Sequence, residues 1–197
     1  MSTSVDFFDR QFSVQVHEDQ HELNPFEMMT RPYLKGDVLD FGCGLGNLSI
    51  VAAESGSRVL ALDASPTAIA HLQKTASERG LPLTAVQTDL RSHRIDGSYD
   101  VVAAIGLLMF FNQKTALKQL AHLMSSVRPG GVAAVNVLIE GTDFLDMFGS
   151  EPYYLFGRYE LRDAFNGWKV LAESYDDFSA PRSTVKRFAT VIARRPN

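Results

Sequence analysis

The sequence predicts an α/β fold: a doubly wound, mostly parallel sheet that carries an N-terminal helical extension. The main observation is that short apolar segments alternate with helix-like segments from Val38 to Ile139. Strands that alternate with helices form parallel sheets covered by helices on both faces. A second observation is the glycine-rich segment 42–46, which directly follows the first apolar run. We therefore divide the chain into an extension or lid over residues 1–35 and a main domain over residues 36–197.

The expected strands and helices follow one another in a regular order. Segment 38–41, VLDF, is a short apolar run bounded by glycine, which is typical of strands buried on both faces. Ser65 and Pro66 provide an N-cap and a first residue for the helix after the second strand, and Gly80 ends that helix. We expect strands at 38–41, 58–63, 83–89, 99–106 and 132–139, and helices at 48–55, 67–80 and 113–127.

The two ends of the chain give less regular patterns. Residues 1–35 mix apolar and polar residues and predict a helical extension with loops. The motif PGG, residues 129–131, is expected to turn the chain into the fifth strand. In the tail we expect a short helix at 158–165 and two last strands at 168–178 and 187–195.

Composition and charge limit the classes of function. The chain is 45% hydrophobic and 21% charged with a net charge of -4, which is typical of a globular protein and disfavours nucleic-acid binding. A single cysteine, Cys43, excludes an internal disulfide and fits a reducing compartment. No segment approaches the ~20 apolar residues of a membrane helix, and the start lacks a signal-peptide pattern. We expect a cytoplasmic protein, and the sequence leaves the oligomeric state open.

The glycine-rich turn suggests a nucleotide-like ligand. Gly42, Gly44 and Gly46 have the spacing G-x-G-x-G, whereas the dinucleotide fingerprint is G-x-G-x-x-G. Asp40 lies two residues before the first glycine, where a carboxylate would repel a pyrophosphate and attract an ammonium group. A ligand with an amino-acid end, a ribose and a base therefore fits this turn better than NAD.

Two further acids support this interpretation. Asp63 closes the second strand, where an acceptor for two ribose hydroxyls is expected. Asp89 closes the third strand, where it could accept a hydrogen bond from an adenine amino group. An Asp at a strand end is commonly only a turn residue or a helix cap. Three such acids at the ends of three successive strands are much harder to explain by turns.

At this point the chain resembles a known family. Five of its motifs are similar to the successive motifs of class I S-adenosylmethionine-dependent methyltransferases: VLDFGCGLGNLS, VLALDASPTAIA, TDL, YDVVAAIGLLMFF and PGG. The stretches LLMFF, YELRDAFNGWKV and KRFATVIARR resemble the TehB-type tellurite-resistance methyltransferases. The resemblance implies a seven-stranded sheet whose last strand is antiparallel, and S-adenosylmethionine as the cofactor. It implies cofactor binding by Gly42, Gly44, Asp63 and Asp89, to which we add Asp40, Gly46, Ala64, Leu90 and Ile105.

The methyl acceptor is expected beyond the end of the fourth strand. LLMFF ends that strand, and the aromatic segment 144–156 could form an apolar wall, although core packing explains some of these residues. The loop DDFSAPRSTV departs from the family's pattern of a His-Arg pair and a further Arg, because it holds one Arg and no His. Our candidate pocket residues are Leu108, Met109, Phe110, Tyr153 and Arg182, of which Arg182 is the candidate catalytic residue.

One further motif suggests a metal. HEDQH, residues 17–21, matches the H-E-x-x-H motif of zinc proteases. Its flanks are polar and no convincing third ligand follows, so we expect no metal. Cys43 is expected to be a packing residue rather than a nucleophile.

These observations predict an S-adenosylmethionine-dependent methyltransferase that acts on a small molecule. A soft acceptor, such as a thiol, selenite or tellurite, would need no strong base. Two alternatives remain: an NAD-dependent oxidoreductase, which the glycine spacing disfavours, and a module that binds S-adenosylmethionine without catalysis.

Overall fold

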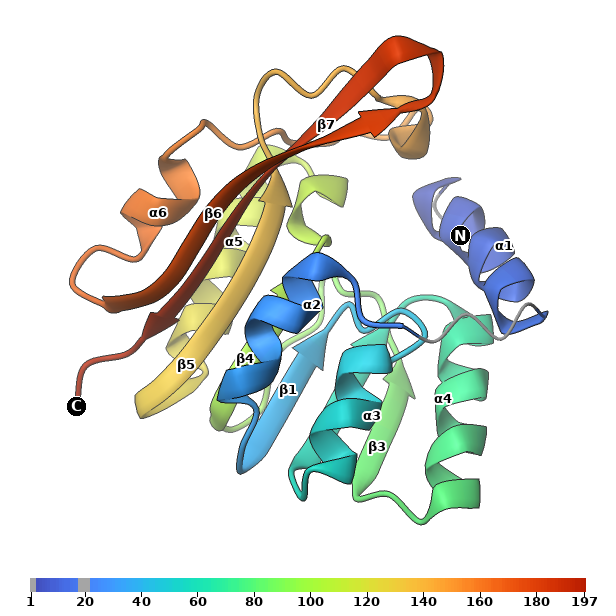
Figure 1. The fold of residues 1–197 in the computed structure, drawn as a ribbon, viewed down its shortest axis with the longest axis vertical. Helices are drawn as coiled ribbons and strands as arrows, with labels where there is room; N and C mark the ends of the chain where they lie inside the picture. Colours follow the sequence, from blue (N-terminus) through green and yellow to red (C-terminus); the bar gives the residue numbers. More distant parts are fainter. Residues whose placement is uncertain (1–2, 18–21) are drawn as a thin grey trace.

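The computed structural model describes residues 3–17 and 22–197 (Figure 1). Its centre is one seven-stranded sheet with the strand order β3-β2-β1-β4-β5-β7-β6. The strands are β1 (Asp37–Phe41), β2 (Arg58–Asp63), β3 (Leu83–Gln87), β4 (Tyr99–Ile105), β5 (Val127–Leu138), β6 (Lys169–Ala180) and β7 (Thr184–Arg194).

The sheet is mixed rather than mostly parallel, which corrects our expectation. The four pairings among β1 to β5 are parallel, whereas β7 is antiparallel to both β5 and β6. The short connection Pro181–Ser183 accounts for the pairing of β6 with β7, because strands joined by a tight turn form an antiparallel hairpin. An antiparallel last strand is the feature that the family resemblance implied.

Helices cover the sheet where the sequence predicts them. The helices after β1 and β2 and the one between β4 and β5 agree with the expected segments to within about two residues. The described helices are α1 (Thr3–His17), α2 (Pro25–Thr30), α3 (Asn47–Glu54), α4 (Pro66–Arg79), α5 (Gln113–Ser125) and α6 (Glu160–Ala164). Short 3₁₀ turns are η1 (Arg31–Tyr33), η2 (Leu108–Phe110), η3 (Asp146–Phe148) and η4 (Pro181–Ser183).

Both faces of the central strands are buried, as the apolar run VLDF predicts. In β1, Val38 packs in the cluster that includes Ile50 of α3 and Leu72 of α4. The next residue, Leu39, points to the opposite face and packs in the cluster that includes Leu120 of α5. Consecutive side chains of a strand alternate between faces, so a strand between two helical layers must be apolar throughout.

The fifth strand begins earlier than expected. Residues 129–131, predicted as a turn, lie within β5. The pairing of β5 with β4 shifts there, from Tyr99 opposite Val127 to Val101 opposite Val132. Additional residues in one strand of a pair form a bulge, and glycines tolerate the backbone conformation that this needs.

The N-terminal segment contributes two helices that lie apart from each other. Helix α2 packs beside the sheet, where Met29 contacts the cluster formed by Val132, Ala134 and Ile192. Helix α1 lies beyond the carboxyl ends of the strands, next to α4 (Figure 1). Within the described residues, no helix has the length and apolar character that a membrane span requires.

Candidate cofactor and acceptor site

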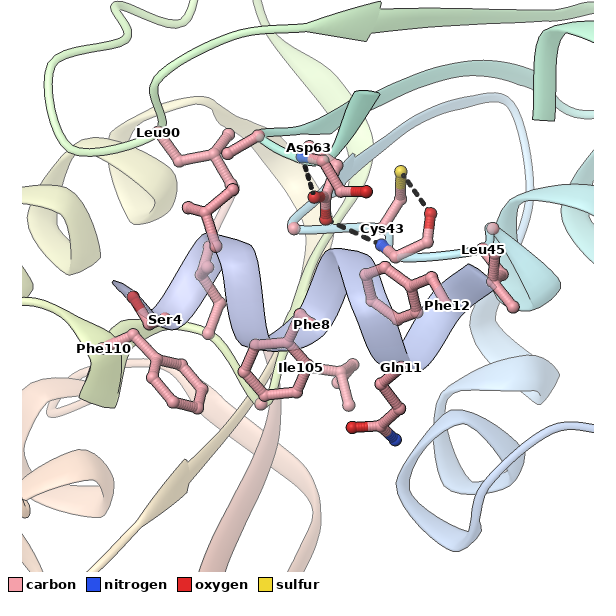
Figure 2. A pocket seen from close by; sticks show the side chains of 18 of the residues that line it. Ser4, Phe8, Gln11, Phe12, Cys43, Leu45, Asp63, Leu90, Ile105 and Phe110 are labelled. Carbon is pink, nitrogen blue, oxygen red and sulfur yellow. Dashed lines mark hydrogen bonds between the residues drawn. The ribbon is translucent and has the colours of Figure 1, made fainter. Parts of the chain in front are cut away.

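A cavity of about 760 Å³ lies at the carboxyl ends of β1, β2, β3 and β4 (Figure 2). This edge includes the point where the sheet order changes from β1 to β4, the usual position of ligands in open α/β sheets. Of the nine residues we predicted for the cofactor, eight line this cavity: Gly42, Gly44, Gly46, Asp63, Ala64, Asp89, Leu90 and Ile105.

The glycine turn forms the floor of the cavity next to β1. Gly46 is the N-cap of α3 and has a φ of 78°, in the left-handed region that glycine tolerates best. A Cβ atom on Gly44 would lie 3.1 Å from the ring of Phe12 in α1. The absence of side chains on these residues therefore lets both a ligand and α1 approach the backbone closely.

Asp63, at the end of β2, is held by the backbone on either side. Its two carboxylate oxygens accept hydrogen bonds from the N–H groups of Gly44 and Ser65, each at 2.8 Å. Burial raises the pKa of Asp63, although these hydrogen bonds oppose the rise. Each carboxylate oxygen can accept about two hydrogen bonds, so Asp63 can still accept from a ligand hydroxyl.

Asp89 lies two residues beyond β3 and is more exposed. Its carboxylate accepts a hydrogen bond from the Arg91 side chain at 2.9 Å and another from the Arg91 backbone at 3.1 Å. Burial alone would raise the pKa of Asp89, but the hydrogen bonds from Arg91 outweigh it and lower that pKa. The positive charge of Arg91 is therefore already balanced by Asp89 where Arg91 lines the cavity.

Asp40 lies beneath the glycine turn and does not line the cavity. It is 3% exposed, and its carboxylate accepts a hydrogen bond from the Ser49 hydroxyl at 2.6 Å. Burial raises the pKa of Asp40 to about 7, and the negative charges of Glu27 and Asp63 contribute to the increase. Asp40 could act on a ligand through its charge, but the structure does not place it at the cavity surface.

One face of α1 closes the other side of the cavity, which sequence reasoning did not predict in detail. Ser4, Phe8, Gln11, Phe12 and Gln15 line it, at the three- and four-residue spacing of a helix face. Figure 2 shows α1 crossing the cavity, with Phe8 lying between Phe110 and Phe12. The signal in the sequence was the group of phenylalanines in the extension, which includes Phe8 and Phe12. We assigned the extension to a possible lid but did not assign these side chains to the site.

Helix α1 is fixed at two places. The Asp9 carboxylate accepts hydrogen bonds from the Thr67 N–H at 3.1 Å and from the hydroxyls of Ser65 and Thr67. Burial alone would raise the pKa of Asp9, but these hydrogen bonds outweigh it and lower that pKa. At the start of the helix, the Ser4 hydroxyl donates to Glu151 at 2.7 Å. A negative charge at the N-terminus of α4 is also favourable to the helix dipole.

The expected acceptor pocket is only partly present. Phe110 lines the cavity, and its ring packs edge-on against Phe8, with centroids 5.0 Å apart. Leu108 and Met109 are fully buried in the core instead. Tyr153 stacks on Phe148 behind Phe110 and is not a lining residue. Because η2 turns immediately after β4, only some of the side chains in LLMFF can face the cavity.

Arg182 does not reach the cavity. It lies in the η4 turn between β6 and β7, and its side chain is 71% exposed and paired with Asp146. The family resemblance placed the loop over the site, but it could not show that an acid 36 positions away would pair with this guanidinium. The role of Arg182 in catalysis therefore stays a prediction without support from the geometry.

Sequence reasoning also missed Glu27 of α2, which lines the cavity near the glycine turn. Burial raises the pKa of Glu27. Among residues 3–17 and 22–197 there is no group of three or more His, Cys, Asp or Glu that could hold a metal. The HEDQH motif lies outside the described residues, except for the backbone of His17 at the end of α1.

Comparison with known proteins finds similarity to methyltransferases, as the motifs of the sequence predict. The model of a family described as a methyltransferase domain matches residues 38–131. Hemagglutinin 1 of Eikenella corrodens is 27% identical over 81% of this chain and 54% of its own length. The probable S-adenosyl-L-methionine-dependent methyltransferase TehB of Haemophilus influenzae is 25% identical over 80% of this chain and 57% of its own length. The chain thus spans little more than half the length of these curated relatives.

Solved structures agree in fold. The crystal structure of TehB from Haemophilus influenzae superposes with a TM-score of 0.77 and 21% identity, over 92% of this chain and 65% of that chain. A structure concerned with the conversion of a disulfide bond into a thioacetal group during echinomycin biosynthesis has a TM-score of 0.64 and 27% identity, over 87% and 82% of the two chains. The chain therefore resembles TehB in sequence and shares the fold of its structure, and its residues 38–131 match a methyltransferase domain.

Proposed function

We propose that this protein transfers the methyl group of S-adenosylmethionine to a small, apolar acceptor at a soft atom, most simply the sulfur of a thiol. The observation that carries the proposal is the composition of the cavity at the carboxyl ends of β1 to β4. The glycine turn, Asp63 and Asp89 lie along one side of it, and the rings of Phe8 and Phe110 form an apolar wall on the other.

The polar side of the cavity suits each part of the cofactor. The carboxylate of Asp63 would accept hydrogen bonds from the ribose hydroxyls, and Asp89 would accept one from the adenine amino group. The methionyl ammonium would lie near the glycine turn, where its positive charge would favour the ionised forms of Asp40 and Glu27, whose pKa values burial raises in the protein alone. S-adenosylmethionine has a positive sulfonium and a positive ammonium, so an acid-rich cavity favours it by charge.

Charge also bears on the acceptor. The acidic and basic side chains that line the cavity are Glu22, Glu27, Asp63, Asp89 and Arg91, and the last of these is paired with Asp89. An oxyanion such as selenite or tellurite would enter an acid-rich cavity in which the residues that the structure describes offer no cation other than the paired Arg91. A thiol would enter the cavity uncharged and react as its thiolate, its proton passing to water; with a thiol pKa of ~8.5 this needs no strong base. The new sulfur–methyl bond would form as the bond between the methyl group and the sulfonium sulfur breaks, which leaves S-adenosylhomocysteine. The echinomycin-related structure concerns chemistry at sulfur, which supports the same choice.

Helix α1 would act as the lid of this site. Its aromatic face covers the glycine turn and the end of β4, so the closed helix would exclude water from the transferring methyl group. Holding the acceptor and the methyl group in line at ~3–3.5 Å can by itself supply several kcal/mol of the rate enhancement. The chain's contribution to catalysis would therefore be positioning rather than acid or base chemistry.

The proposal is tested in two steps. Isothermal titration should detect binding of S-adenosylmethionine and S-adenosylhomocysteine but not NAD, which separates a methyltransferase from an oxidoreductase. Production of S-adenosylhomocysteine should then require an acceptor from a panel of apolar thiols, selenite, tellurite and amines. Turnover with thiols supports the proposal, whereas turnover only with oxyanions or amines would refute the acceptor assignment. Binding without turnover on any acceptor would instead support a non-catalytic binding module.

A further inference from the structure

Gln119 is a polar residue at a core position of α5. It is 1% exposed and lies in the same buried row as Ala116, Leu120 and Leu123. An amide buried in such surroundings costs free energy unless its hydrogen bonds are replaced within the protein. The partners of Gln119 therefore indicate why the helix carries an amide where an apolar side chain would pack.

The Gln119 amide nitrogen faces three backbone carbonyls of one loop. Nε2 lies 2.8 Å from the carbonyl oxygen of Leu90, 3.1 Å from that of Arg91 and 3.2 Å from that of His93. The opposite orientation of the amide would place Oε1 against three oxygen acceptors, so the donor assignment follows from the chemistry. Oε1 is buried and has no hydrogen-bond partner among the described residues.

The loop held by Gln119 is the part of the cavity assigned to adenosine. Residues 88–98 connect β3 to β4 without forming a helix or strand, and Asp89, Leu90 and Arg91 line the cavity. The start of the loop is tied to β2, because the Thr88 N–H donates to the Asp63 carbonyl at 2.9 Å. Gln119, which does not line the cavity, fixes the segment that follows through the carbonyls of Leu90, Arg91 and His93.

We propose that Gln119 is a positioning residue, which sets the loop carrying Asp89 and Leu90 against the adenosine end of the cofactor. A leucine or methionine would fill the same space without an unpaired Oε1, so packing alone does not account for the amide. This inference rests on the proposed use of S-adenosylmethionine. It adds a residue on a helix that does not itself line the cavity.

The test compares Gln119→Met with Gln113→Met. Methionine keeps the volume of residue 119 but cannot donate to the three carbonyls, whereas Gln113 is an exposed glutamine at the start of the same helix. In Gln119→Met, the Kd values for S-adenosylhomocysteine and for 5′-methylthioadenosine should both rise ~10-fold, because loss of several hydrogen bonds frees the loop. The KM for S-adenosylmethionine should rise similarly, while kcat at saturation should change by less than about twofold. Gln113→Met should match the wild type.

A purely structural role would give a different result. If Gln119→Met lowers the melting temperature but binds both adenosine ligands within about twofold of the wild type, the inference is wrong. Should Gln119→Met fail to fold, Gln119→Asn keeps the amide but shortens its reach by one methylene, and its Kd values must then rise. Wild-type protein that binds neither adenosine ligand would overturn both the proposed function and this inference, whereas normal wild-type binding with unchanged variants overturns the inference alone.

Discussion

At the scale of single residues, the site consists of carboxylates whose surroundings differ. Asp63 is held by two backbone N–H groups beside the cavity, Asp89 is paired with Arg91 at its rim, and Asp40 is buried below the glycine turn. Similar residues at three successive strand ends therefore have different access to a ligand. Their roles can be separated by mutating them one at a time.

We expect Asp63→Ala to weaken binding of S-adenosylmethionine and S-adenosylhomocysteine by about 1.5–3 kcal/mol, the range for hydrogen bonds to a charged group. Asp96→Ala, an exposed acid on the β3–β4 loop, should leave both affinities unchanged and serves as the control. Isothermal titration measures both variants. Unaltered affinity in Asp63→Ala would mean that the ribose lies elsewhere.

Asp40 predicts a dependence of stability on pH. Its pKa is about 7 in the folded protein because of burial, against an ordinary value of 3.8. Between these values the unfolded chain has released the proton and the folded chain has kept it, so stability falls as pH rises through this window. Relative to the wild type, Asp40→Asn should therefore gain in urea midpoint from about pH 4 to about pH 7 and then level off. A midpoint difference that is constant over this range would show that Asp40 is ionised in the folded state throughout.

Arg182 is expected to matter little for catalysis. Its ion pair with Asp146 is exposed on both sides, and such pairs contribute about 0–1 kcal/mol to stability. We predict that Arg182→Ala changes kcat/KM for a thiol acceptor by less than ~3-fold, because a side chain outside the cavity removes no transition-state contact. Steady-state kinetics with the thiol acceptor, on the wild type and Arg182→Ala side by side, measure this change. A loss of ~10-fold or more would restore the catalytic role that the sequence suggested.

At the scale of elements, α1 is the helix on which the closed site depends. The Asp9 carboxylate joins it to the N-terminus of α4, immediately after the segment that carries Asp63 and Ala64. Movement of α1 away from the cavity would break this contact and would uncover the glycine turn at the same time. Binding of the cofactor and closure of α1 are therefore expected to be coupled.

We predict that Asp9→Ala destabilises the closed position of α1 by about 1 kcal/mol, the usual loss for a carboxylate that caps a helix N-terminus. Hydrogen exchange over residues 3–17 should become faster, and S-adenosylhomocysteine should dissociate roughly 5-fold faster. Asp6→Ala, an exposed acid on the same helix, is the matched control. If exchange of these residues is the same in both variants, Asp9 does not hold the lid.

The sequence predicts some of these elements much better than others. The glycine turn and the acids Asp63 and Asp89 were predictable because parallel strands bring their carboxyl ends to one edge, whatever the rest of the chain does. The contact of Phe12 with Gly44 was not, because an amphipathic helix does not reveal which distant surface it covers. The same holds for Arg182, because its partner Asp146 lies 36 positions earlier in the chain and only the tertiary structure brings the two side chains together.

At the scale of the whole molecule, the sheet order explains why one edge holds everything the proposed reaction needs. The order changes direction between β1 and β4, which opens the space that the glycine turn, the acids and α1 surround. The alternation of strands and helices predicts this arrangement as far as Ile139. It does not predict the antiparallel strand β7, whose direction depends on the short turn that joins it to β6.

The central claim, methyl transfer from S-adenosylmethionine to a small soft acceptor, is tested most directly by product analysis. The protein is incubated with S-adenosylmethionine and an excess of an apolar thiol, and both products are quantified by mass spectrometry. We predict equal amounts of S-adenosylhomocysteine and methyl thioether, with neither product formed when the protein or the thiol is omitted. Intact S-adenosylmethionine after incubation with every thiol tested, in protein shown to bind it, would contradict the account.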